Sequence, residues 1–319
     1  MSHLIEATEL HAPIRDPFDH PVADVVRPAG ATFESEPLLS LMGVPFDTTT
    51  MGRRGSRHAP AGIRQTLAGL LSHHAGFGVD LADGGGIADF GDVDVVETDV
   101  EETWSRISAA TRELAGAGRP LSVLGGNHGL TFPALRGALE ARAGTVALVS
   151  LDAHYDVRPS HRGQPASGVP FRYALERLDG RVPPGACTQI GIAGWENSGQ
   201  AAAYLADRAV RVFPARHVHR HGLDGVLEET LGRADEADGL WLTLDIDAVD
   251  VAHAPGTNAP TVGGLTSDQL LEIVWTLARH PRLIGLDVVE VSPPFDVADA
   301  TQLLAAHALL TALAARQAG

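Results

Sequence analysis

Two aspartates and a histidine alternate in the segment SLDAHYDVRPS, which covers residues 150–160. They are Asp152, His154 and Asp156, and they follow directly after an apolar run. Such a run is typical of a buried strand, because parallel strands covered on both faces are nearly continuous in apolar residues. Carboxylate and imidazole groups are suitable ligands for divalent ions such as Mn²⁺. The segment therefore predicts metal ligands at the end of a buried strand.

Three further apolar runs end in residues of similar chemistry. These residues are His128 in GGNHGLT, Asp245 and Asp247 in DIDAVD, and Glu290 in EVSP. Taken alone, His128 is interpreted as a hydrogen-bonded loop histidine, and the aspartates as helix caps or turn formers. In an open α/β sheet, however, the carboxyl ends of the strands meet at one edge. Carboxylates gathered there without cations would repel one another, so we predict a pair of bound metal ions.

A calcium-binding EF-hand is the competing interpretation of DIDAVD, because aspartates also alternate in that loop. The EF-hand loop requires glycine at its sixth position and glutamate at its twelfth. This sequence has Asp250 and Gly256 at those positions. The sequence therefore argues against a calcium loop.

The elements that would position these residues alternate between strand and helix from about Pro37 onward. This rhythm predicts an α/β fold with parallel strands and crossover helices. The expected strands lie at 38–44, 121–124, 145–151, 188–192, 210–213, 240–244 and 283–291. The expected helices lie at 59–71, 100–117, 132–142, 200–207, 267–279 and 301–316. The glycine-rich segment DGGGIADFGD lacks the GxGxxG spacing of a dinucleotide site and is interpreted as a loop leading into a short strand.

Composition limits the class of protein. The 319 residues have a formal net charge of −16 and are 44% hydrophobic. An acidic chain is a poor candidate for nucleic-acid binding, which needs a face rich in lysine and arginine. The lone Cys187 favours a cytoplasmic location, and no run approaches the roughly 18 apolar residues of a membrane span. We expect a loosely ordered segment at 1–36 and a single catalytic domain at 37–319.

Five motifs, in order, make the chain resemble the ureohydrolase superfamily of arginases and agmatinases. They are GVPFDTTTMGRRGSRHAPAGIRQTL, GGNHG, SLDAHYD, TLDIDAVDVAHAPGTNAP with GGLT, and DVVEVSP. The resemblance runs from about Leu41 to the C-terminus. It implies an arginase-type fold of three layers, with helices on both sides of a central parallel sheet. It also implies a homo-oligomer, two Mn²⁺ per chain (or another divalent metal), and hydrolysis of a C–N bond in a small amidine or guanidine.

The resemblance further implies a role for each candidate residue. The ligands of one ion would be His128, Asp152, Asp156 and Asp245. Those of the other would be His154, Asp152, Asp245 and Asp247. Asp152 and Asp245 would thus bridge the two ions and count among the catalytic residues. Glu290 would be both catalytic and substrate-binding, because its carboxylate can pair with a cationic amidine.

Departures from the superfamily pattern bear on the substrate. Asn127 replaces the aspartate of GGDH, and Ser167 in QPASGVPFR replaces a histidine of arginases and agmatinases. A loop of the type SGxPFR, with DVR after the metal motif, is more similar to formimidoylglutamases. Those enzymes convert N-formimidoyl-L-glutamate and water to L-glutamate and formamide. Arg158 and Arg172 flank this loop, so we expect them to bind the substrate's two carboxylates beside Ser167.

Other interpretations stay open. A surface salt bridge is as well supported as substrate binding for Arg172, and less well supported for Arg158, which is only two residues from a ligand. The alternative function is that of an agmatinase or guanidino-acid amidinohydrolase, which releases urea. A relative that binds metal without catalysis is a third alternative, suggested by Asn127 and Ser167.

Overall fold

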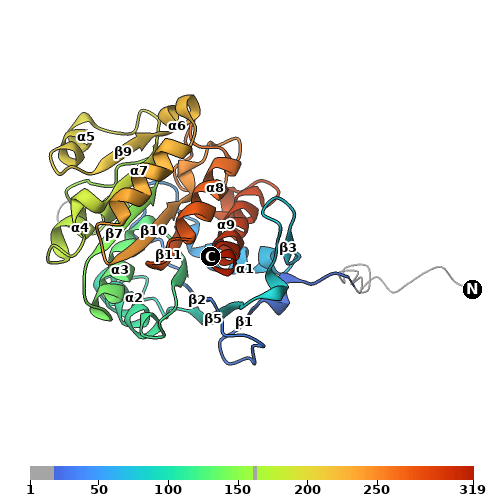
Figure 1. Cartoon of the computed structure of the whole chain (residues 1–319). Helices are drawn as coiled ribbons and strands as arrows, with labels where there is room; N and C mark the ends of the chain where they lie inside the picture. Colours follow the sequence, from blue (N-terminus) through green and yellow to red (C-terminus); the bar gives the residue numbers. More distant parts are fainter. Residues whose placement is uncertain (1–17, 161–163) are drawn as a thin grey trace, which may run out of the picture.

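The structure is a computed structural model that describes residues 18–160 and 164–319. A nine-stranded sheet forms its centre, and helices cover both faces of that sheet (Figure 1). The strand order is β1-β5-β2-β6-β11-β10-β7-β8-β9, and every neighbouring pair is parallel. The predicted α/β fold with a central parallel sheet is confirmed.

The elements of the described residues have the following bounds. The strands of the main sheet are Val26–Pro28 (β1), Leu39–Gly43 (β2), Ile87–Asp92 (β5), Leu121–Leu124 (β6), Val146–Leu151 (β7), Thr188–Ile192 (β8), Arg211–Pro214 (β9), Gly239–Asp245 (β10) and Leu283–Val289 (β11). A separate antiparallel pair consists of His73–His74 (β3) and Val79–Asp80 (β4). The α-helices are Ala59–Leu67 (α1), Val100–Ala115 (α2), Thr131–Glu140 (α3), Pro170–Arg177 (α4), Gly199–Ala206 (α5), Ala215–His221 (α6), Asp224–Ala234 (α7), Ser267–Ala278 (α8) and Ala300–Ala318 (α9).

Apolar side chains fill the space on both faces of the sheet. Strand β10 is an example, because successive side chains of a strand point to opposite faces and here apolar residues lie on both. Leu242 and Leu244 belong to the cluster beneath α1, α6, α7, α8 and α9, whereas Trp241 belongs to the cluster beneath α2, α3, α4 and α5. All seven residues of β10 are buried. This burial of the central strands fixes the sheet edge on which the predicted ligands lie.

The register brings the ends of the four central strands together. Leu244 of β10 pairs with Leu151 of β7, and Val288 of β11 pairs with both Leu244 and Leu124 of β6. The residues that follow these positions therefore emerge side by side at the carboxyl edge of the sheet.

The N-terminal part of the described chain differs from the expectation. A loosely ordered segment was expected at 1–36, but Val26–Pro28 forms the edge strand β1 and pairs with Ile87–Asp92. Val22 and Val25 are buried against the core, which explains why this stretch is fixed in place. Residues 1–17 of that segment lie outside the described residues. Within the described ranges, each helix is too short or too polar to cross a membrane.

Candidate metal centre and substrate cleft

The six predicted metal ligands meet at the carboxyl edge of the central strands. Their positions follow from the strand ends: His128 begins a short turn after β6, Asp152, His154 and Asp156 follow β7, and Asp245 and Asp247 end β10 and enter the next turn. Gly126, between β6 and His128, lies so close to the backbone of Phe46 that an added Cβ would be 1.8 Å from the Phe46 carbonyl oxygen. The second glycine of GGNHG is therefore required by this close approach.

The ligand atoms point at one another in two groups. His128 Nδ1 lies 3.2 Å from Asp152 Oδ2, 2.9 Å from Asp156 Oδ2 and 3.2 Å from Asp245 Oδ2. His154 Nδ1 lies 3.5 Å from Asp152 Oδ1 and 3.1 Å from Asp247 Oδ2. Asp152 belongs to both groups and turns one oxygen toward each histidine. This is the arrangement expected of a carboxylate that bridges two ions.

The electrostatics of this cluster favour bound cations. Burial and the neighbouring Asp152 carboxylate raise the pKa of Asp156 to about 6. Burial, together with Asp247 and Asp152, also holds the pKa of Asp245 well above its ordinary value. His128 Nδ1 and Asp152 Oδ2 are buried and form no hydrogen bond with any described residue. Oxygen and imidazole ligands of this kind fit two hard or borderline divalent ions, which would remove the repulsion between the carboxylates.

A buried hydrogen-bonded chain supports His128 from the side away from the ligands. His128 Nε2 lies 3.0 Å from Thr243 Oγ1, and Thr243 donates to Asp287 Oδ1 at 2.5 Å. Trp241 Nε1 donates to Asp287 Oδ2 at 2.6 Å. A histidine that offers Nδ1 to a metal carries its proton on Nε2, so the Thr243 hydroxyl can accept a hydrogen bond from Nε2 and orient the ring. This hydrogen-bonded chain was not predicted from the sequence, although the polar Asp287 inside the apolar run LIGLDVV indicates a buried group that needs a partner.

Asn127 supports His128 from the turn itself. Its side-chain Oδ1 accepts a hydrogen bond from Gly129 N at 3.1 Å, and its Nδ2 donates to Thr49 Oγ1 at 2.8 Å and Thr50 Oγ1 at 3.2 Å. Asn127 thus caps the short helix that carries His128 and ties it to the loop after β2. An amide can donate to the two hydroxyl groups, which an ionised aspartate cannot do.

Glu290 occupies the end of β11 in a strained backbone conformation. Its φ is 63°, in the left-handed region that non-glycine residues rarely adopt. Its carboxylate accepts a hydrogen bond from His128 N at 2.6 Å and another from Asn258 Nδ2. Burial raises the pKa of Glu290 to about 8. Such strain often marks a functional position, because only a well-packed surrounding can maintain it.

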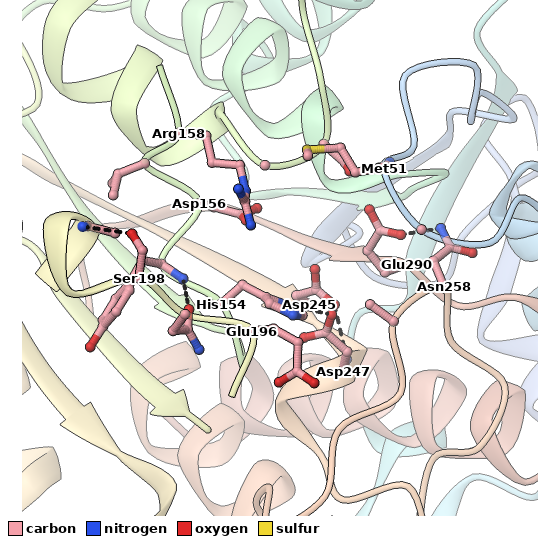
Figure 2. Close-up of a pocket in the computed structure, with 18 residues that line it drawn as sticks. Met51, His154, Asp156, Arg158, Glu196, Ser198, Asp245, Asp247, Asn258 and Glu290 are labelled. Carbon is pink, nitrogen blue, oxygen red and sulfur yellow. Dashed lines mark hydrogen bonds and ion pairs between the residues drawn. The ribbon is translucent and has the colours of Figure 1, made fainter. Parts of the chain in front are cut away.

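A cleft of about 260 Å³ opens beside the ligand cluster (Figure 2). Its lining includes seven of the predicted site residues, namely His154, Asp156, Arg158, Ser167, Asp245, Asp247 and Glu290. Figure 2 shows the Arg158 side chain reaching into the cleft toward Asp156. Arg158 lies against Gly168, where an added Cβ would be 3.1 Å from Arg158 Cδ. Its guanidinium has no hydrogen-bond or ion-pair partner among the described residues, so it is free to bind a substrate anion.

Ser167 is held at the cleft wall by the backbone. Its hydroxyl accepts a hydrogen bond from Met51 N at 3.0 Å, and its N–H donates to Thr49 O at 2.9 Å. These bonds join the loop that contains Ser167 to the loop after β2.

Arg172 lies outside the lining of this cleft. Its Nε donates to Glu176 Oε2 at 3.1 Å, one turn further along α4, and its guanidinium stacks over Tyr204 at 4.5 Å. The structure thus favours the salt-bridge interpretation of Arg172 over substrate binding.

The loop after β8, which forms part of the wall of the cleft, was not predicted from the sequence. Glu196 and Asn197 line the cleft, and Asn197 Nδ2 donates to Ala153 O at 2.7 Å, within the ligand segment. Trp195, next to them, is fully exposed. This loop follows the carboxyl end of the strand expected at 188–192, and that position could have identified it, because ligands bind at the carboxyl ends of strands.

Comparisons with known proteins agree with this geometry. Residues 38–315 match the model of the arginase family. The chain is 32% identical to formimidoylglutamase of Bacillus subtilis over 280 residues, and 36% identical to agmatinase of Edwardsiella ictaluri over 275 residues. Each match covers 86% of both chains. The crystal structure of the Bacillus subtilis formimidoylglutamase superposes with a TM-score of 0.87 and 29% identity, and the match covers 98% of this chain and 96% of that one.

Proposed function

The chain belongs to the arginase family, and from this premise we propose that it hydrolyses N-formimidoyl-L-glutamate to L-glutamate and formamide. The observation that carries this proposal is Arg158, which has no ion-pair partner among the described residues and lies in a cleft otherwise dominated by carboxylates. This substrate has two carboxylates, which need a fixed cation, whereas agmatine has none. The forked guanidinium of arginine is well suited to bind a carboxylate.

The six ligands would hold two divalent ions, for which we propose Mn²⁺. When bound, such ions lower the pKa of water and so supply a nucleophile at neutral pH. The other steps belong to the protein's own side chains. Glu290 pairs with the cationic formamidine and holds its carbon beside the ligand cluster. Arg158 binds a carboxylate at the other end of the substrate, so the two contacts together fix its orientation.

An agmatinase-type activity is the second candidate, and Glu196 favours it. A carboxylate in the wall of the cleft suits the distant amine of agmatine better than it suits a dianion. The agmatinase of Edwardsiella ictaluri is also somewhat more similar in sequence than the formimidoylglutamase of Bacillus subtilis. Glu196 and Arg158 thus favour different substrates, and their relative importance decides between the two activities.

A product assay separates the candidates. The Mn²⁺-treated protein should release formamide from N-formimidoyl-L-glutamate with a kcat/KM at least about 100-fold above that for urea release from agmatine or guanidino acids, as expected for one buried charged contact worth about 3 kcal/mol. Faster release of urea would replace our assignment with the second candidate. Failure on every substrate, with two ions bound, would favour a relative that binds metal without catalysis.

A further inference from the structure

A second cavity, at the opposite edge of the sheet, is rich in arginine. It has a volume of about 390 Å³, and its lining includes Arg119, Arg142, Arg282 and Asp238. These residues lie just before β6, β7, β11 and β10, respectively. They therefore lie at the amino ends of the same four strands whose carboxyl ends carry the metal ligands. Three arginines around one cavity are unusual in a chain with a net charge of −16.

Two arginines at this edge have a structural role. Arg181 donates to the carbonyl oxygens of Leu139 and Arg142, both at 2.6 Å, at and just beyond the end of α3. Arg282 donates to Asp235 O at 3.2 Å and Ala237 O at 2.9 Å, just after α7. The last carbonyl groups of a helix lack partners within the helix, and cations stabilise that end. Arg181 and Arg282 are therefore explained as helix-capping residues.

Arg142 has no such role. Its guanidinium forms no hydrogen bond or ion pair with any described residue, and its Nε is buried without a partner. Burial lowers the pKa of Arg142, the nearby charge of Arg181 lowers it further, and the carboxylate of Asp238 partly offsets both effects. Asp238 is the one acidic residue in the lining, and it already accepts hydrogen bonds from Thr145 N at 2.8 Å and Thr145 Oγ1 at 3.1 Å. Asp238 therefore acts on Arg142 through space and forms no ion pair with it, and a buried donor without an acceptor is destabilising.

Arg119 adds a second incompletely paired guanidinium. Its Nε donates to Ser40 Oγ at 2.8 Å, and its two terminal amino groups have no acceptor among the described residues. We propose that this cavity binds an oxyanion, a phosphate or a carboxylate group, through Arg142 and Arg119. Arg282 also lines the cavity, but its guanidinium is paired with the Asp235 carboxylate. The forked donors of two arginines match the oxygen geometry of such a group. This proposal does not depend on the substrate of the catalytic cleft.

The alternative is that the positive charge of Arg142 only offsets the negative ends of α2 and α3, which also border the cavity. The two interpretations predict opposite effects of Arg142→Met on the stability of the anion-free protein. If Arg142 only offsets the helix ends, Arg142→Met lowers stability in the absence of anions. If Arg142 lacks an acceptor, Arg142→Met leaves the anion-free protein as stable as the parent or raises its melting temperature, because it removes a repulsion with Arg181 that is larger than the attraction of Asp238.

Sulfate is the first probe, added to the Mn²⁺-treated full chain at constant ionic strength maintained with sodium chloride. The parent should show a saturable rise in melting temperature, and calorimetry should give a dissociation constant at least tenfold higher for Arg142→Met. Arg119→Met should weaken binding in the same direction. Arg216→Met, which removes an exposed arginine of α6 with no side-chain hydrogen bond or ion pair to any described residue, is the matched control and should bind sulfate like the parent.

Succinate is the second probe, and it distinguishes a carboxylate ligand from a phosphate-like one. An Arg142-dependent response that is stronger for succinate than for sulfate identifies a carboxylate, and the reverse order identifies a tetrahedral oxyanion. The proposal is overturned if neither anion gives an Arg142-dependent response. It is also overturned if Arg158→Met, in the catalytic cleft, abolishes the response, or if Arg142→Met destabilises the anion-free protein.

Discussion

At the scale of single residues, Arg158 and Arg172 flank the same loop, yet the Arg158 side chain lines the cleft and the Arg172 side chain pairs with Glu176. Arg158→Met should raise KM for N-formimidoyl-L-glutamate and lower kcat/KM by about 10- to 100-fold, because it removes the proposed charge-assisted contact, which would be made in both the bound and the transition state. Steady-state kinetics on protein with verified metal content measures this effect.

Arg172→Met is the matched control for Arg158→Met. It removes the same charge from the same segment but leaves the cleft lining intact, so kcat/KM should stay within about twofold of the parent value. A loss confined to kcat in Arg158→Met, or an equal loss in Arg172→Met, would contradict the assigned role of Arg158.

Thr243 gives a second prediction at this scale. Thr243→Val removes the hydroxyl between His128 and Asp287 without changing the size of the side chain. We expect Mn²⁺ affinity to fall by about 10- to 100-fold, the usual effect of losing a group that orients a metal-bound histidine. Equilibrium dialysis followed by elemental analysis measures the bound metal directly.

Two further variants test whether the hydroxyl itself is responsible. Thr243→Ser keeps it and should retain most of the affinity. Thr188→Val changes another buried strand threonine, whose Oγ1 has no hydrogen-bond partner among the described residues, and should leave metal binding unchanged. Equal effects of Thr188→Val and Thr243→Val would show that packing, rather than the hydrogen-bonded chain, controls affinity.

The metal-ligand candidates could be predicted from the sequence because each one directly follows an apolar run. Asp152, Asp245 and their neighbours need only the rule that parallel strands end at a common edge. Thr243 and Asp287 lie inside strands instead, and a polar residue in a strand does not reveal which partner it meets on the next one. Arg172 shows the same limit, because the direction of a side chain from α4 depends on packing.

At the scale of elements, the turn between β6 and the short helix at His128–Leu130 is the most constrained connection in the site. Gly126→Ala would place a methyl group 1.8 Å from the Phe46 carbonyl oxygen, which is backbone and cannot rotate away. The turn must then shift and move His128. We expect weaker metal binding and a kcat/KM at least about 100-fold lower, since small displacements of catalytic groups have effects of that size.

Gly225→Ala is a suitable control for the glycine substitution. Gly225 lies in α7, where an added Cβ meets no atom within 4 Å. Its replacement should leave metal content and activity unchanged and increase helix stability slightly. Normal metal content in Gly126→Ala would mean that the turn tolerates the displacement.

The sequence predicted elements well where an apolar run or stripe was long. The strand expected at 188–192 is β8 with the same bounds, and the helix expected at 267–279 is α8, which ends one residue earlier. The helices α4, α6 and α7 were missed. In α6, ARHVHRH, only Ala215 and Val218 are buried, so no apolar stripe was present to detect. Its packing against β8 and β9 fixes this helix instead.

At the scale of the whole molecule, the buried carboxylates link stability to pH when metal is removed. The pKa of Glu290 is about 8 and that of Asp156 about 6 in the folded protein, both above their ordinary values because of burial. At pH values between the ordinary and the raised pKa values of these two groups, the folded state therefore holds more protons than the unfolded state. The stabilisation is complete at low pH and is lost as pH rises, so the free energy of unfolding in EDTA should fall between about pH 5 and pH 8.

Urea unfolding at several pH values, with and without Mn²⁺, tests this prediction. Metal binding requires deprotonated ligands, so the stabilisation by Mn²⁺ should increase over the same pH range. Glu290→Gln removes one of the titrating groups and should make the pH dependence in EDTA less steep. Stability in EDTA that rises from pH 5 to pH 8 would contradict the pKa directions of this site.

The parallel pairing of β10 with β7 and β11, and of β11 with β6, joins segments that are far apart in the sequence. Such non-local pairings form slowly, because long stretches of chain must be ordered before they are made. The ligand set is complete only once all four strands are aligned, so the ions have no site to bind early in folding. Mn²⁺ should therefore leave the refolding rate unchanged and slow unfolding, because the ions stabilise the native state and not the transition state for folding.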